Sequence, residues 1–144
     1  MTTVQDCIDQ GYLRKCAFDI KLVEKELKEA EYDFGKAKHA LEEEDFKWCI
    51  VKAYYSMFHA AKAVLFSLGL REKRHFAVGV VLEDLVKKGK LESRYVDYFS
   101  SAMEWRESAD YKYTHSEEIA TDIVANTEKF IFKMKGLLNR NLSQ

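Results

Sequence analysis

An apolar repeat in the early part of the chain constrains its fold more than any other feature. Apolar residues recur at alternating steps of three and four positions, at Leu13, Cys16, Ile20, Val23, Leu27, Ala30, Phe34, Ala37 and Leu41. This spacing returns to one side of an α-helix at every turn, and it leaves the opposite side polar. The repeat therefore predicts one long amphipathic helix that packs against other helices in a bundle.

The composition favours helices along the rest of the chain as well. The 144 residues include no proline and only six glycines, while 47% are hydrophobic and 33% are charged. An all-β fold needs many tight turns, and these are usually built with glycine and proline. A chain of this length can bury a core of its own. We therefore expect a single all-α domain over residues 1–144.

Apolar periodicity and turn signals divide the rest of the chain into further helices. The pattern predicts short helices over about 3–10 and 76–88, and long ones over about 46–68, 93–110 and 116–140, with a basic loop over 71–75. Short connections make consecutive helices antiparallel. The predicted architecture is an up-and-down four-helix bundle with additional short helices.

The predicted helix 46–68 is apolar around most of its circumference. One stripe contains Val51, Tyr54, Phe58, Ala61, Leu65 and Leu68, and a second contains Ile50, Ala53, Met57, Ala60 and Val64. Only a thin polar line remains, at Lys52, Ser56, His59 and Lys62. Such a helix is either surrounded within the monomer or meets another subunit through its second face. We expect a homodimer formed through this helix.

Charge, cysteines and hydropathy narrow the class of protein. The 23 basic and 24 acidic residues give a net charge of −1, which restricts any nucleic-acid binding to a local site. Cys7, Cys16 and Cys49 show no CxxC spacing, as expected for reduced thiols of a cytoplasmic protein. No apolar run approaches the ~18 residues of a membrane span, and the first residues lack a basic leader, so we expect neither a membrane protein nor a signal peptide.

The predicted helix 93–110 contains a charged pair where its pattern calls for apolar residues. A stripe that starts at Val96, Phe99 and Met103 continues by steps of three and four to Arg106 and Asp110. Burying charge is unfavourable unless the charge is paired or used. The pair is therefore either a structural ion pair at the end of the bundle or part of a site for an anion such as phosphate.

Several other polar residues admit a structural and a functional interpretation. Tyr55 and His59 lie one turn apart, and each is either a satisfied packing residue or part of a cleft. His75 follows Arg71 and Arg74, and this cluster is either a solvated loop or an anion site near a helix N-terminus.

Metal chemistry finds little support in the sequence. A di-iron bundle needs Glu-x-x-His on two helices, and only residues 72–75 match, beside a loop. We expect no metal site and no cofactor.

Three blocks of sequence carry a resemblance to a known family. They are AYYSMFHAAKAVLFSLGL over Ala53–Leu70, the segment His75–Val80, and RESADY over Arg106–Tyr111. In this order and at these separations they resemble the HEPN domain family, over about residues 28–135. The resemblance is to its small stand-alone archaeal and bacterial members.

The resemblance implies a helical bundle that usually forms a homodimer. Many HEPN domains are metal-independent ribonucleases with an Arg-x4–6-His motif at the dimer cleft. Others pair with a minimal nucleotidyltransferase in toxin–antitoxin modules, and some are non-catalytic binding units.

Arg106 matches the arginine of that motif, but Tyr111 stands where the histidine is expected. The next histidine, His115, follows the arginine after eight intervening residues, outside the motif's spacing. Tyrosine, with a reference pKa near ~10, is a poor general base at neutral pH. Arg106 can still hold a phosphate, and Tyr111 can donate a hydrogen bond or stack on a base.

Three hypotheses follow from these residues. The favoured one is a homodimer that binds a nucleotide or RNA phosphate, or that serves as the partner of a nucleotidyltransferase. Its site would contain Arg106, Asp110, Tyr111, Tyr55, His59 and His75. The second is a metal-independent ribonuclease that uses Arg106 with Tyr111 or His115. The third is a structural helical dimer without a ligand.

Overall fold

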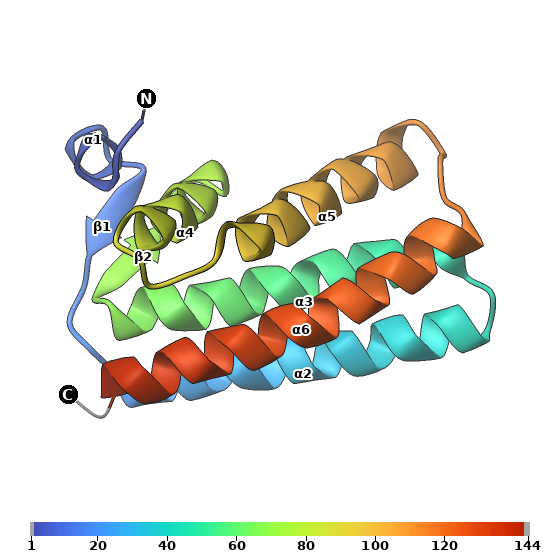
Figure 1. Ribbon diagram of the computed structural model, residues 1–144, viewed down its shortest axis with the longest axis horizontal. Helices are drawn as coiled ribbons and strands as arrows, with labels where there is room; N and C mark the ends of the chain where they lie inside the picture. Colours follow the sequence, from blue (N-terminus) through green and yellow to red (C-terminus); the bar gives the residue numbers. More distant parts are fainter. Residues whose placement is uncertain (1, 143–144) are drawn as a thin grey trace.

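The computed structural model describes residues 2–142 and shows a helical bundle with a small β-ribbon at one end (Figure 1). Within this range the elements follow in the order α1 (Val4–Asp9), β1 (Leu13–Lys15), α2 (Ile20–Glu42), α3 (Phe46–Ser67), β2 (Leu70–Glu72), α4 (Phe76–Lys87), α5 (Ser93–Tyr111) and α6 (Glu117–Leu142). Helices α2, α3, α5 and α6 are long and alternate in direction (Figure 1). The predicted all-α, up-and-down architecture is confirmed.

Helix α2 begins later than the apolar repeat predicts. Its N-cap is Asp19, whose carboxylate accepts a hydrogen bond from the Lys21 amide at 2.9 Å. Leu13, at the start of the repeat, is buried as predicted, but it lies in a strand. The prediction of a helix from residue 13 was therefore wrong. Periodicity identifies which residues are buried, whereas backbone pairing with a distant segment decides their secondary structure.

That distant segment is β2, which forms an antiparallel ribbon with β1. Arg14 lies opposite Arg71, and the Cys16 amide donates to the Gly69 carbonyl at 2.9 Å. Gly69 has φ +72°, and a Cβ atom there would lie 3.2 Å from the Cys16 oxygen. A glycine is required because the chain both turns left-handed and approaches its partner closely. Part of the predicted loop 71–75 is thus a strand.

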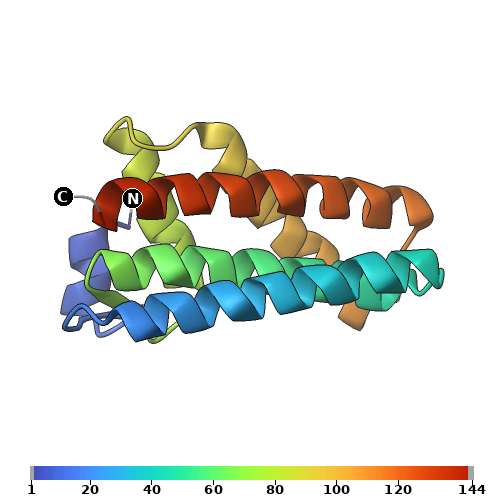
Figure 2. The same ribbon diagram turned by 90° about the horizontal axis from the view of Figure 1, so that it is seen from below.

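Helix α3 is the centre of the molecule. It contacts α2, α4, α5, α6 and β2, and Figures 1 and 2 show it enclosed by the other long helices. Except for Leu68 at the C-cap, which is 39% exposed, the residues of both apolar stripes are buried within the single chain, and Ile50, Met57 and Val64 have an exposure of 0%. The apolar excess of this helix is therefore covered without a second subunit. The expected dimer through α3 loses that support.

The least covered side of α3 is its polar side. Lys52, Tyr55, His59 and Lys62 are only partly buried, although their neighbours on the helix are buried. They form one stripe because steps of three and four residues keep to one side of a helix. Carboxylates of α2 contact His59 and Lys62 on this side, and Arg106 of α5 contacts Tyr55.

Candidate phosphate-binding site

Arg106 of α5 lies against two tyrosines of α3. Its guanidinium carbon is 4.9 Å from the ring centre of Tyr54 and 5.9 Å from that of Tyr55. The two rings meet edge to face, with centres 5.2 Å apart. A guanidinium over an aromatic face is attracted by the ring quadrupole, and stacking fixes its orientation. The tyrosines of the YYxxFH block thus position the arginine of the RESADY block.

The charge of Arg106 is balanced by one carboxylate. Nη1 lies 3.6 Å from Oδ2 of Asp110, one turn further along α5, and the two side chains are 19% and 30% exposed. This separation is longer than the usual charge-assisted hydrogen bond of about 2.7–2.9 Å. The predicted pairing of the two residues is confirmed, but the pair is loose.

Arg106 also retains an unused donor. Its Nε atom is buried and has no hydrogen-bond partner among the described residues. Leaving a buried donor unsatisfied costs about 1–3 kcal/mol. Because a guanidinium presents its donors as a planar fork, an anion that reached this fork would recover that free energy.

Burial shapes the chemistry of the tyrosine beneath the arginine. Tyr54 is 1% exposed, and this burial raises its pKa to about 12 despite the opposing charge of Arg106. Its hydroxyl therefore stays protonated at neutral pH and cannot serve as a base. Tyr54 is a neutral platform for Arg106, while Tyr55 beside it is half-buried and accessible.

Tyr111 and His115 do not join Arg106 within one chain. Tyr111 is five residues beyond Arg106, about 140° around the helix, and is 76% exposed. It lines a shallow hollow with Glu104, Glu107, Ser108 and Lys112. His115 lies between α5 and α6 and is exposed. Of the predicted residues, the structure thus brings Asp110 and Tyr55 to Arg106, and it turns Tyr111 away.

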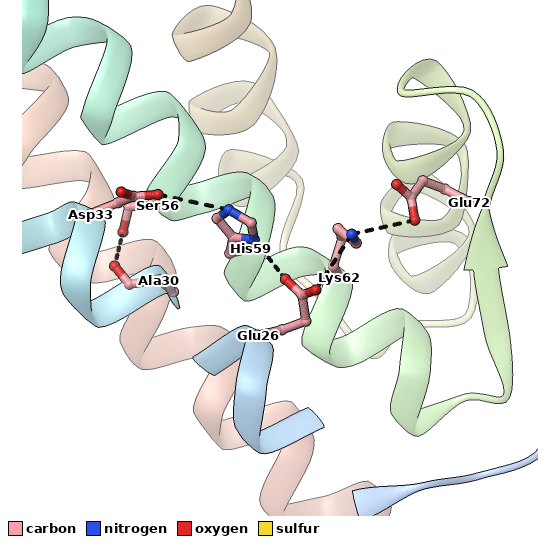
Figure 3. Close-up of polar contacts among 7 residues, drawn as sticks. All are labelled: Glu26, Ala30, Asp33, Ser56, His59, Lys62 and Glu72. Atoms are coloured by element: carbon pink, nitrogen blue, oxygen red, sulfur yellow. Dashed lines mark hydrogen bonds and ion pairs between the residues drawn. The ribbon is translucent and has the colours of Figure 1, made fainter. Parts of the chain in front are cut away.

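His59 lies between two carboxylates of α2 (Figure 3). Its Nδ1 is 2.6 Å from Oε2 of Glu26, and its Nε2 is 3.7 Å from Oδ2 of Asp33. Both ring nitrogens therefore face partners. This arrangement fits the structural interpretation of His59 as a satisfied interface histidine that ties α3 to α2.

The network extends from Glu26 towards the β-ribbon. Lys62 lies 3.4 Å from Oε1 of Glu26 and 3.8 Å from Oε1 of Glu72 in β2. On the other side, the hydroxyl of Ser56, which is fully buried, donates to the Ala30 carbonyl at 2.6 Å (Figure 3). The polar line of α3 is therefore a seam that joins it to α2 and β2.

The pKa values of Glu26 and Asp33 are shifted in opposite directions. Burial pushes the pKa of Glu26 upward, but the hydrogen bond from His59 and the charge of Lys62 outweigh burial, so the pKa is lowered. Burial dominates at Asp33 and raises its pKa, although Lys52 and His59 oppose the shift. Glu26 is therefore a stabilised anion at neutral pH, whereas the charge of Asp33 is less well compensated.

His75 lies at the start of α4 and is exposed. Its ring centre is 4.5 Å from that of Phe58, and Phe58 stacks on Tyr54 with centres 6.1 Å apart. A row of rings therefore leads from His75 through Phe58 to the tyrosines beneath Arg106. His75 is connected to the arginine through packing rather than through a hydrogen bond.

Sequence reasoning missed Glu26, Asp33 and the role of Tyr54. Glu26 and Asp33 are seven residues apart and border the apolar repeat, and Lys52 and His59 have the same separation on the next helix. Matching heptad spacings of carboxylates on one helix and of nitrogen-bearing side chains on its antiparallel neighbour were the available signal.

Within residues 2–142, no group of three or more histidine, cysteine or acidic side chains is placed to hold a metal ion. In the same range no helix combines the length and the hydropathy that a membrane crossing requires.

Comparison with known proteins places the chain in a family. The model of the HEPN domain matches residues 23–137, most of the described chain. A UPF0332 protein of Archaeoglobus fulgidus is 31% identical over 121 residues, which cover 83% of this chain and 97% of that protein. A protein of Methanocaldococcus jannaschii named "Putative toxin" is 31% identical over 116 residues, which cover 78% of this chain and 86% of that protein.

A further relative, a UPF0332 protein of Pyrococcus horikoshii, is 37% identical over 79 residues, or 54% of this chain and 56% of that protein. The region that the family model matches contains α3 and α5, whose tyrosines and arginine form the arrangement described above. On the family match and on the extent of these similarities, the chain belongs to the HEPN domain family.

Proposed function

We propose that this protein binds the phosphate of a nucleotide or of RNA at Arg106, as a HEPN homodimer. The observation that carries the proposal is the packing of the Arg106 guanidinium and its lack of close polar partners among the described residues. The guanidinium is stacked on Tyr54, its Nε is buried without a partner among the described residues, and its nearest carboxylate is 3.6 Å away. A positioned cation with unused donors is suited to a phosphate, which accepts two parallel hydrogen bonds from arginine.

The names of the relatives support a toxin–antitoxin-like setting. Two similar proteins of Methanocaldococcus jannaschii carry the name "Putative toxin". In such a module this protein would be paired with a minimal nucleotidyltransferase, as the family resemblance suggests. The phosphate site and the partner are compatible, because a nucleotidyltransferase handles nucleotides.

A metal-independent ribonuclease is the second candidate. The toxin names favour it, and Arg106 would stabilise the charge that develops on the scissile phosphate. Tyr111 is turned away from Arg106 in its own chain, so it would have to act across the dimer on the partner's Arg106. The same condition applies to His115, which is exposed between α5 and α6.

Substitution of Arg106 tests the proposal. Arg106→Gln removes the charge, and Arg106→Lys keeps the charge but loses the planar fork. Since a hydrogen bond to a charged group is worth about 1.5–3 kcal/mol, we expect Arg106→Gln to weaken binding of a nucleotide or a short RNA by roughly 10- to 100-fold. Isothermal titration calorimetry measures this change, and Arg106→Lys should restore only part of the affinity.

Arg94 provides a matched control on the same helix. Its guanidinium also stacks on a tyrosine, with the carbon 5.0 Å from the ring centre of Tyr95, but far along α5 from Arg106. Arg94→Gln should leave binding unchanged. If Arg106→Gln lowered only the melting temperature and left binding intact, the pair would be structural and the proposal would fail.

An RNA cleavage assay with and without EDTA separates the two candidates. EDTA-resistant cleavage that Arg106→Ala abolishes would establish the ribonuclease. Binding without cleavage would establish the binding module.

A further inference from the structure

We propose that the β1–β2 ribbon is a second phosphate-binding surface, and that the ligand is a single-stranded oligonucleotide whose backbone extends from this ribbon to Arg106. The inference rests on the proposed function, because it extends the ligand of the Arg106 site from one phosphate to a chain of phosphates. The surface, here called the basic ribbon, consists of Arg14, Arg71, Lys73 and Arg74.

The basic ribbon concentrates positive charge in a molecule whose net charge is −1. All four side chains are exposed, although they come from two segments far apart in the sequence. The acidic residue among them, Glu72, is directed inward, where its carboxylate lies 3.8 Å from Lys62 (Figure 3). The outer surface of the ribbon is therefore cationic.

The register of the strands places two of these cations side by side. Arg14 lies directly opposite Arg71, so their side chains project from the same face of the ribbon. Like charges in this position are destabilising. Within the described residues neither guanidinium forms an ion pair, and Arg71 instead lies 5.9 Å from the ring centre of Phe66. A bound polyanion would supply the counter-charge that these residues do not provide.

The backbone beneath these side chains is fixed by several hydrogen bonds. The amides of Lys73 and Arg74 both donate to the Tyr12 carbonyl, at 2.8 and 3.3 Å, and the Cys16 amide donates to Gly69 at 2.9 Å. The cations therefore project from a rigid base. Binding then requires ordering of side chains but not of the backbone, which lowers its entropic cost.

A row of aromatic rings connects the basic ribbon with Arg106. His75 follows Arg74 directly, and its ring lies 4.5 Å from Phe58, which stacks on Tyr54 beneath Arg106. His75 is exposed and Tyr55 is half-buried, so both can stack on bases. Phe58 and Tyr54 are buried, at 5% and 1% exposure, so they support the accessible rings and do not themselves contact bases. Cationic sites beside accessible aromatic rings are the pattern by which proteins hold single strands, whose unpaired bases are free to stack.

The experiment compares affinity and its salt dependence for two lengths of RNA. Fluorescence anisotropy measures Kd for labelled oligouridylates of about 4 and about 16 nucleotides, the range that single-stranded sites span. The test variant is Arg14→Gln/Arg71→Gln/Arg74→Gln. The control variant, Lys25→Gln/Lys28→Gln/Lys36→Gln, removes the same charge from exposed positions of α2. Circular dichroism verifies that both variants are folded.

We expect the wild type to bind the long RNA at least about tenfold more tightly than the short one, because only the long RNA reaches both cationic sites. The ribbon variant should lose that advantage, and its plot of log K against log salt should become shallower by about 2, since each phosphate contact to a single strand contributes ~0.7. The control variant should retain most of the affinity. Single-stranded DNA of the same length shows whether the phosphate chain that binds is that of RNA or of DNA. Duplex RNA should bind more weakly than single-stranded RNA.

The outcomes separate this inference from the proposed function. Binding that depends on Arg106 but is the same for the ribbon and control variants would overturn the inference and leave the proposed function intact. Binding that depends on the ribbon but not on Arg106 would support a phosphate-binding surface on the ribbon, but it would overturn the Arg106 proposal and the path of the strand from the ribbon to Arg106. Polyglutamate binding as tightly as RNA of equal charge would overturn the preference for phosphate, and it would indicate an acidic protein as the partner.

Discussion

His59 and Arg106, two nitrogen-bearing side chains near the exposed side of α3, differ in how their nitrogen atoms are partnered. His59 is held by Glu26 at 2.6 Å and faces Asp33 at 3.7 Å, so its ring nitrogens are occupied. Arg106 has one carboxylate at 3.6 Å and a buried donor without a partner among the described residues. The sequence predicted both as site residues. The geometry favours Arg106 for a ligand and His59 for the attachment of α3 to α2.

Glu26→Gln should destabilise the protein at neutral pH by about 1–3 kcal/mol, because Glu26 is largely buried and accepts charge-assisted contacts from His59 and Lys62. The pKa of Glu26 is lowered in the folded state, so its contribution is fully present above the unfolded pKa and is lost as pH falls through the folded pKa. Urea unfolding at neutral pH and towards ~pH 3, below the ~4.3 reference pKa, should show the difference between wild type and variant shrinking.

Glu31→Gln is the matched control for this prediction. Glu31 pairs with Lys135, but both side chains are about half exposed, so its loss should cost less than about 1 kcal/mol. A loss in Glu26→Gln that stayed constant across the pH range would show that the replaced acceptor atom rather than the charge of Glu26 is responsible.

At the scale of elements, the β-ribbon is where sequence reasoning failed. The apolar repeat correctly predicted that Leu13 is buried, but Leu13–Lys15 pairs as a strand with Leu70–Glu72, far along the chain. Strands of three residues are too short to show a clear alternation of apolar and polar residues. Their pairing depends on the position of the C-terminal end of α3, because β2 follows that end directly. Apart from the start of α2, the helices were predictable to within a few residues, because their apolar stripes and N-caps such as Asp45 are local features.

Gly69→Ala tests the construction of this ribbon. The substitution places a Cβ in a left-handed conformation, at φ +72°, and 3.2 Å from the Cys16 oxygen. We expect a loss of about 1–3 kcal/mol in the free energy of unfolding. Thermal and urea unfolding measure it.

Gly11→Ala separates the cost of backbone strain from the cost of the close contact with Cys16. Gly11 has φ +79°, but a Cβ atom at this position would have no neighbour within 4 Å among the described residues, so only backbone strain is added. Its loss should be smaller than that of Gly69→Ala. Equal losses would show that the close approach to Cys16 contributes nothing.

At the scale of the whole molecule, the single chain covers its own central helix. Met57 and Val64, which the sequence assigned to a second, subunit-facing stripe, are fully buried among the helices of one chain. The homodimer is therefore a proposal that rests on the family resemblance. The ribonuclease candidate additionally needs an arrangement in which Tyr111 or His115 of one chain reaches the partner's Arg106.

Light scattering tests the assembly directly. We expect a mass near twice the 16.8 kDa of the chain at micromolar concentration. A monomer across that range would overturn the homodimer of the proposed function and would remove the ribonuclease candidate, which needs Tyr111 or His115 from a partner chain. The titrations above would then test phosphate binding at Arg106 in a single chain.

The sequence by itself determined the helical class, the approximate helices and the conflict at Arg106 and Asp110, because these follow from local spacing of apolar and charged residues. Tertiary structure alone decided that Tyr54 supports Arg106, that His59 is enclosed by Glu26 and Asp33, and that Arg14 faces Arg71. Each of these contacts joins residues far apart in the chain. Their geometry depends on how whole elements pack, which periodicity within a single helix does not encode.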